Sequence, residues 1–226
     1  MKSIILASKS EVRKKILDEN NIKCFVEPSN LDEDEVKKSL INQGASPELI
    51  SKNLAELKAN KVSQKRMGEI VLGADSVIDL NGKLISKPTN RIEAMNILTL
   101  LNGKSHFLIS SVCISLDGKM IWNYTEKAEM KMKNFSKEEL KEYLSKISDK
   151  NLYSYNVYQI EGEGKKLFSE IKILIASFLL VGFEISLPFK SITLSAPKTI
   201  SPVLFWLTLF AFNSAKFLDI TSGVAP

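Results

Sequence analysis

One acidic residue, Asp75, lies in a sequence context where a charged carboxylate has a high free-energy cost. It lies within an otherwise apolar run of strand length, residues 70–80 (IVLGADSVIDL). A carboxylate inside such a strand loses hydration and needs a cation, a cluster of hydrogen bonds or a proton. Asp75 is therefore a candidate metal ligand or general base. The alternative is a bulge or strand-end acid that is bonded to nearby backbone amides.

A second candidate group opens the first expected helix. Ser8 and Ser10 place two hydroxyls before the helix, and Arg13 places a guanidinium in its first turn. The unpaired N–H groups and the dipole at a helix N-terminus attract phosphate. The alternative is that Ser10 is only an N-cap and Arg13 only a surface residue.

Two lysines and an acidic run are further candidates. Lys87 directly follows the expected hairpin of Asp75, so its ammonium can reach back toward that carboxylate. Lys58 lies on an expected helix, where most lysines are simply solvated. Glu33, within the acidic run 31–35, is a candidate second metal ligand, although an acidic helix start is the ordinary interpretation.

A glycine-flanked acid near residue 160 and the single histidine complete the candidates. Glu161 precedes Gly162 in QIEGEG, and the glycines permit close backbone approach to a ligand or form a plain turn. His106 is interpreted as the end of a loop and is excluded from the active site.

The elements that must position these residues alternate between strands and helices. Asn81-Gly82 is a strong hairpin signal, Asp117-Gly118 marks another hairpin, and Ser136 with Glu139 forms a capping box. A helix opening at Ser46-Pro47 is expected to bury Ile50, Leu54, Leu57 and Val62. The remaining expected elements are strands over 3–7, 22–26, 83–86, 107–116 and 119–126, and helices over 11–20 and 91–101. Together they predict an α/β fold, a mixed sheet with flanking helices.

Composition narrows the class of protein. Hydrophobic residues make up 44% of the 226 residues and charged residues 25%, which excludes a disordered chain. The net charge of +5 comes from scattered lysines, which favours a small anionic partner over a nucleic-acid polymer. The two cysteines lack CxxC spacing and predict reduced thiols. The N-terminus has too short an apolar run for a signal peptide, so we expect a cytoplasmic protein.

The amino-acid composition of the chain changes after residue 172. Residues 173–226 contain only five charged side chains, and their apolar runs 173–183 and 203–212 are too short for a confident membrane span. We therefore predict two parts, a folded domain over 1–172 and an atypical apolar tail over 173–226. A frameshift or a fused segment would explain the tail.

Several blocks, in order, resemble the Maf family of nucleotide pyrophosphatases. They are ILASKS with Arg13, GADSV, the NG turn with Lys87-Pro88, LNGKSH and YQIEGEG with Leu167-Phe168, spanning about residues 2–172. Five blocks in the right order are far more specific than one motif.

The resemblance implies a fold and an activity. Family members have two lobes around a central cleft, as in inosine triphosphatase-like proteins, and often form homodimers. They cleave a nucleoside triphosphate between the α and β phosphates, giving a monophosphate and pyrophosphate, and they require Mg or Mn. They are associated with septum formation.

The resemblance also assigns roles. Asp75 would be the acid-base residue or a metal ligand, and Glu33 would join the metal or water network. The triphosphate would be surrounded by Ser8, Ser10, Arg13, Lys58 and Lys87, with Glu161 near the cleft.

Two departures leave alternatives open. Glu11-Val12-Arg13 replaces the usual Pro-Arg-Arg, and Glu161 in place of Gln leans slightly toward members that act on modified triphosphates such as 7-methyl-GTP. One alternative is a catalytically weak nucleotide-binding regulator of cell division, and another is a protein held at a membrane by its tail. The leading hypothesis needs no membrane and no nucleic-acid polymer.

Overall fold

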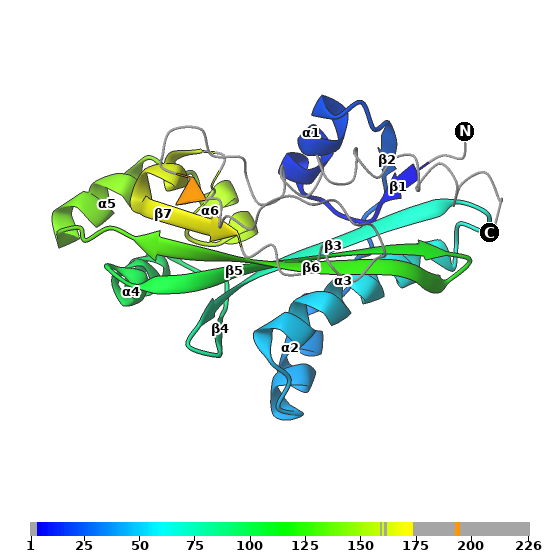
Figure 1. Cartoon of the computed structure of the whole chain (residues 1–226), viewed down its shortest axis with the longest axis horizontal. Coiled ribbons are helices and arrows are strands. Elements are labelled where there is room, and N and C mark those ends of the chain that lie inside the picture. The colour runs from blue at the N-terminus through cyan, green and yellow to red at the C-terminus, as the bar shows by residue number, and fades with distance from the viewer. Residues whose placement is uncertain (1–3, 159, 161, 174–192, 195–226) are drawn as a thin grey trace, which may run out of the picture. The chain divides into compact units, whose positions relative to one another are not determined.

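The computed structural model describes residues 4–158, 160, 162–173 and 193–194 (Figure 1). Glu161 and nearly all of the predicted tail lie outside these residues, so the division at residue 172 stays a prediction. The chain divides into two compact units. Among the described residues, unit 1 holds 4–77 and 110–125, and unit 2 holds the rest.

The strands form a mixed sheet, as expected. The strands are β1 (Ile4–Leu6), β2 (Cys24–Val26), β3 (Ile70–Leu80), β4 (Lys83–Ile85), β5 (Ser105–Leu116), β6 (Lys119–Met132), β7 (Phe168–Ile173) and β8 (Thr193–Leu194). Neighbouring strands follow the order β2-β1-β3-β5-β6-β7-β8, and β4 pairs with β3. The pairs β1–β2 and β1–β3 are parallel, whereas β3–β4, β6–β7 and β7–β8 are antiparallel. The three long strands β3 (Ile70–Leu80), β5 (Ser105–Leu116) and β6 (Lys119–Met132) contribute residues to both units.

Unit 1 has helices on both faces of its strands (Figure 1). Its other elements are β1 (Ile4–Leu6), α1 (Glu11–Glu19), β2 (Cys24–Val26), α2 (Glu33–Asn42) and α3 (Pro47–Ser63). One face packs Ala55, Ala59 and Val62 of α3 on the strands. The other packs Ile16 and Leu17 of α1. Alternate side chains of a strand point to opposite faces, so β1 and the paired start of β3, Ile70–Leu72, are apolar on both faces.

Unit 2 has a single apolar core. Its elements are β4 (Lys83–Ile85), α4 (Arg91–Leu101), α5 (Lys137–Ser145), α6 (Asp149–Tyr155), a 3-10 turn (Glu163–Leu167), β7 (Phe168–Ile173) and β8 (Thr193–Leu194). Leu98, Met130 and Leu152 lie in this core, fully shielded from solvent. The capping box of Ser136 and Glu139 is present at the start of α5, as predicted.

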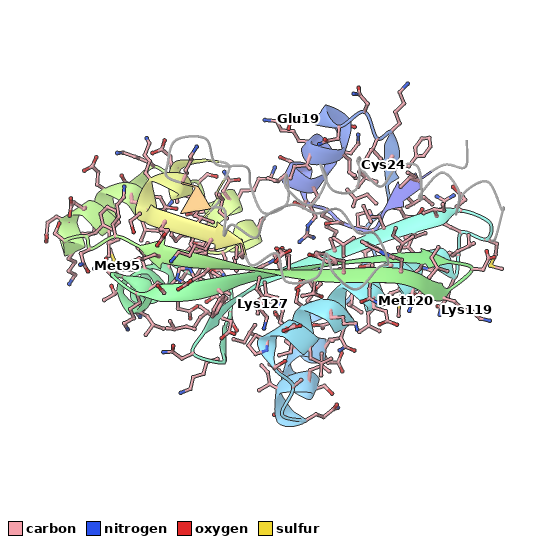
Figure 2. All side chains as sticks on the ribbon, in the orientation of Figure 1. Glu19, Cys24, Met95, Lys119, Met120 and Lys127 are labelled. Carbon is pink, nitrogen blue, oxygen red and sulfur yellow. The ribbon has the colours of Figure 1, made fainter. Side chains whose placement is uncertain are left out.

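Local signals mark the turns correctly. Asn81 and Gly82 both have positive φ, and so do Asp117 and Gly118, as two-residue hairpin turns require. Lys119 and Met120 begin β6 directly after the second turn (Figure 2). Both cysteines are free thiols, with Cys24 on β2 (Figure 2).

Three expectations need correction. β6 continues to Met132 rather than ending at residue 126, because its last residues pair with β7. His106 lies within β5 rather than at the end of a loop. Leu57 is 39% exposed, and the buried face of α3 includes Lys58 instead.

Among the helices of the described residues, none combines the length and the apolar character that a membrane crossing requires.

Candidate functional site

Asp75 lies in the middle of β3 and is 5% exposed. Its Oδ1 accepts a hydrogen bond of 2.7 Å from the Lys58 ammonium, and its backbone carbonyl accepts one of 3.3 Å from the Ser51 hydroxyl. The other carboxylate oxygen, Oδ2, is buried and has no hydrogen-bond partner among the described residues. A buried oxygen without a partner is costly, so Oδ2 is an acceptor available to a ligand.

Lys58 joins two acids from different elements. Its ammonium lies 2.7 Å from Asp75 Oδ1 and 2.8 Å from Glu33 Oε1. Glu33 is the first residue of α2, which Asp32 caps by accepting from the Glu35 N–H. Glu33 therefore both starts an acidic helix and approaches Asp75. A second cation, Lys37, lies 3.7 Å from Glu33 Oε2.

Gly73 allows α3 to lie close enough to β3 for this contact. A Cβ at Gly73 would stand 2.2 Å from the Ala55 carbonyl oxygen and 2.9 Å from the Ala59 Cβ. Real Cβ atoms do not approach other atoms so closely, because van der Waals repulsion rises steeply. Lys58 directly precedes Ala59, and Asp75 lies two residues after Gly73. The close approach of these small residues therefore brings Lys58 to Asp75.

The start of α1 lies against the same strand. Arg13 Nη1 donates to the Ser8 hydroxyl at 3.1 Å and to the Ala74 carbonyl at 2.8 Å. Ser10 caps the helix by accepting from the Arg13 N–H at 3.3 Å. The structure therefore brings the loop of Ser8 and Ser10 beside the chain neighbour of Asp75.

Two serines that are not among the predicted site residues extend this network. Arg13 Nη2 approaches the Ser76 hydroxyl at 3.5 Å, and Ser76 hydrogen-bonds Ser110 on β5 at 3.0 Å. Ser110 is buried. Ser110 could have been recognised from the sequence, because Ser110 and Ser111 place two hydroxyls in an apolar strand and buried hydroxyls need hydrogen-bond partners.

The predicted residues thus fall into two groups. Unit 1 contains Asp75, Lys58 and Glu33 as one ion-pair cluster, and Ser8, Ser10 and Arg13 as the adjoining loop. Lys87 belongs to unit 2 and is exposed, and Glu161 lies outside the described residues. The reach of Lys87 toward Asp75 stays a prediction.

His106 forms a separate buried cluster in unit 2. Its Nε2 shares a 2.8 Å hydrogen bond with the Tyr158 hydroxyl, while its Nδ1 is buried and has no partner in the described part of the chain. Burial lowers the pKa of His106 from 6.5 to about 4, and burial raises the pKa of Tyr158. Both groups are therefore neutral near pH 7. The exclusion of His106 from the active site stays a prediction.

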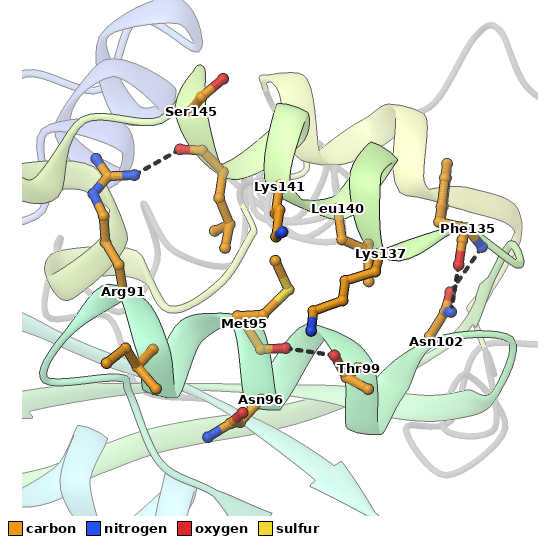
Figure 3. Close-up of a pocket in the computed structure, with 12 residues that line it drawn as sticks. Arg91, Met95, Asn96, Thr99, Asn102, Phe135, Lys137, Leu140, Lys141 and Ser145 are labelled. Carbon is orange, nitrogen blue, oxygen red and sulfur yellow. Dashed lines mark hydrogen bonds between the residues drawn. The ribbon is translucent and has the colours of Figure 1, made fainter.

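A hollow of about 700 Å³ lies between α4 and α5 (Figure 3). Its lining includes Met95, Leu140, Lys137 and Lys141, and Arg91 at one end donates to the Leu144 carbonyl at 2.8 Å (Figure 3). None of the candidate site residues lines it. We therefore do not assign triphosphate binding to this hollow.

The donor set around Asp75 suits a divalent cation that is shared with phosphate. Within the described part of the chain, no group of three or more His, Cys, Asp and Glu side chains is placed to hold a metal. Mg²⁺, however, is commonly held by one or two carboxylates together with substrate phosphates and waters. Asp75 and Glu33 are two such carboxylates, and the unpartnered Oδ2 is a hard oxygen ligand.

Comparison with known proteins gives a consistent picture. The family model described as "Maf-like protein" matches residues 3–185. A nucleoside triphosphate pyrophosphatase of Pelagibacter ubique is 69% identical over 172 residues, which is 76% of this chain and 88% of that protein. One of Roseobacter denitrificans is 38% identical, with 74% of this chain and 84% of the relative covered.

A more distant relative has a narrower name. The 7-methyl-GTP pyrophosphatase of Brucella abortus is 34% identical over 74% of this chain and 84% of its own length. Among solved structures, the Staphylococcus aureus Ham1 protein has a TM-score of 0.35 at 15% identity, over 58% of this chain and 72% of that one. That structural similarity is too low to support an argument. The family model and the sequence identities carry the assignment, and this chain belongs to the Maf family.

Proposed function

We propose that this chain is a nucleoside triphosphate pyrophosphatase, which hydrolyses the α–β phosphoanhydride to a nucleoside monophosphate and pyrophosphate. The observation that carries the proposal is the buried Asp75 carboxylate, which has one oxygen without a partner and stands beside Lys58 and the Arg13 loop. The names of the relatives from Pelagibacter and Roseobacter support the same activity.

The start of α1 is suited to bind the polyphosphate. Arg13 uses three of its N–H groups for Ser8, Ala74 and Ser76, which fixes the guanidinium plane and leaves the others for phosphate oxygens. Backbone N–H groups of the first turn of α1 add to the positive potential. Ser8 and Ser10 supply hydroxyls at the same end.

Asp75 has the position of a general base. In this structure its Oδ1 is paired with Lys58 and its Oδ2 is not, and the carboxylate oxygen that the metal leaves free can accept a proton from an attacking water. The water oxygen forms a bond to the α-phosphorus and one water proton goes to the Asp75 carboxylate. The bond from the α-phosphorus to the bridging oxygen breaks, and pyrophosphate leaves with that oxygen. Burial excludes bulk water from this step and strengthens the electrostatic interactions.

A divalent cation, Mg²⁺ or Mn²⁺, belongs to the same proposal. Asp75 and Glu33 would hold it together with the phosphates. When bound, the cation would neutralise charge on the phosphate oxygens and lower the pKa of a bound water. Lys37, beside Glu33, would keep that carboxylate oriented.

The experiment is hydrolysis of a nucleotide panel by the purified full-length chain. The panel contains the standard ribo- and deoxyribonucleoside triphosphates and 7-methyl-GTP, with Mg²⁺ or Mn²⁺, and chromatography identifies the nucleotide product. We expect a monophosphate from at least one triphosphate. Nucleotide binding without release of any monophosphate would refute the enzyme proposal and favour the weak regulator.

The proposal has finer points that the described residues do not test. Glu161 would contribute to base preference, and Lys87 would contact the triphosphate. A cytoplasmic location and a homodimer stay predictions, which fractionation and sedimentation of the full chain would test.

A further inference from the structure

The Lys58 ammonium is committed to carboxylates. Lys58 is 5% exposed, and its Nζ contacts Asp75 Oδ1 at 2.7 Å and Glu33 Oε1 at 2.8 Å. The resemblance to the Maf family implied that this ammonium lies at the triphosphate. In the structure it is instead the cation between the two acids that the proposed function gives to the metal.

An ammonium and a divalent cation compete for such a position. Both are attracted to the same pair of carboxylates, and they repel one another strongly at short range in a site of low dielectric constant. The contacts of 2.7 and 2.8 Å place the ammonium directly against one oxygen of each acid. A cation that uses both Asp75 and Glu33 must therefore displace it or share their remaining oxygens.

Displacement requires a movement of the side chain rather than of the helix. Helix α3 is held against β3 by the close approach of Gly73 to Ala55 and Ala59. Lysine has a flexible four-carbon stem, so its ammonium can move while its backbone stays in place. Glu33 keeps Lys37 as a second counter-charge after such a movement.

We propose that Lys58 is a positioning residue whose ammonium holds Asp75 and Glu33 together until a divalent cation replaces it, and that the released ammonium then binds the triphosphate. The proposal rests on the proposed function, because it assumes that Asp75 and Glu33 hold the metal. It explains how two acids can stay close in the metal-free protein. It also couples occupancy by the metal to the appearance of a phosphate-binding cation.

The test uses nucleotide-free, full-length protein in three forms: wild type, Lys58→Met and Lys65→Met. Methionine removes the ammonium and keeps an unbranched chain. Lys65 is exposed and follows α3, so its variant controls for the loss of one positive charge. Mn²⁺ is titrated by calorimetry, and the melting temperature is recorded with and without Mn²⁺.

We expect Lys58→Met to bind Mn²⁺ at least tenfold more tightly than wild type and Lys65→Met, and to gain the most in melting temperature from Mn²⁺. Equal affinities and equal gains in the three proteins would overturn the proposal. No binding of Mn²⁺ to any of them would overturn it as well.

A second measurement stands even if Lys58→Met does not fold. In wild type labelled with ¹⁵N at lysine Nζ, an ammonium in two short ion pairs should give a resolved NMR signal, assigned by mutation to Met or Arg. Saturating Mg²⁺ should shift or remove this signal, and adding a non-hydrolysable triphosphate should move it again. A Lys58 signal that saturating Mg²⁺ leaves unchanged would show that the ammonium stays in place. Neither measurement requires turnover, so its failure is distinct from the absence of monophosphate in the nucleotide panel.

Discussion

Replacing Gly73 with alanine tests the claim that close packing of α3 on β3 builds the site. The new Cβ would lie 2.2 Å from the Ala55 carbonyl oxygen. Ordinary contacts between carbon and oxygen are about 3.3 Å, so the helix and strand must separate by roughly 1 Å. Overpacking of this kind lowers the free energy of unfolding by about 1–3 kcal/mol.

The same displacement acts on the ion pair. The backbone of Lys58 would lie about 1 Å farther from Asp75, so the lysine stem must extend to keep its ammonium 2.7 Å from Asp75 Oδ1. A misplacement of about 1 Å at a reacting group lowers turnover by roughly 100-fold. We therefore expect Gly73→Ala to lose both stability and kcat.

Urea unfolding and initial rates of monophosphate release at 25 °C measure the two effects. Gly82→Ala is the matched control. Gly82 has a φ of 79° and open space around it, so alanine there costs about 1–2 kcal/mol in backbone strain without displacing α3. Its kcat should stay near that of wild type. A Gly73→Ala protein with the stability and kcat of wild type would refute the packing argument.

Three further predictions concern substrate binding, pH and metal. Arg13→Lys keeps the charge but loses the planar contacts to Ser8 and Ala74, so steady-state kinetics should show KM raised about tenfold or more; an unchanged KM would exclude Arg13 from phosphate binding. Burial lowers the pKa of His106 from 6.5 to about 4. Between these two pH values the unfolded chain binds a proton that the folded chain does not, so the free energy of unfolding falls as the pH falls. The total loss across this window is roughly 3 kcal/mol. Urea midpoints from pH 7 to 4 should therefore fall less steeply in His106→Phe than in wild type, and parallel curves would contradict this. Chelation of divalent cations should abolish turnover, and added Mg²⁺ should restore it; full activity in excess chelator would refute the metal proposal.

Much of the fold could be predicted because local chemistry determines it. The positive φ of Asn81 and Gly82, and the capping box at Ser136, follow from residue preferences that act over a few positions. The alternation of apolar strands and amphipathic helices likewise indicated an α/β fold. The length of β6 was missed because pairing with a later strand, β7, extends it.

The site residues could be predicted only in part from the sequence. Asp75 could be identified because a carboxylate in an apolar strand must find a partner. The partner could have been found as well, since Leu54, Lys58 and Val62 follow one another at helical spacing on the buried face of α3. What no local pattern contains is the close approach at Gly73, because it depends on two distant segments packing together.

The most direct test of the central claim is product stoichiometry in wild type and Asp75→Asn, measured on the best substrate of the nucleotide panel. Asparagine keeps the shape and an oxygen for Lys58, so the variant should fold and bind nucleotide. We expect one monophosphate and one pyrophosphate per triphosphate in wild type, and a rate about 10²–10⁴-fold lower in the variant. A variant with the rate of wild type, or a diphosphate and inorganic phosphate as the products, would contradict it.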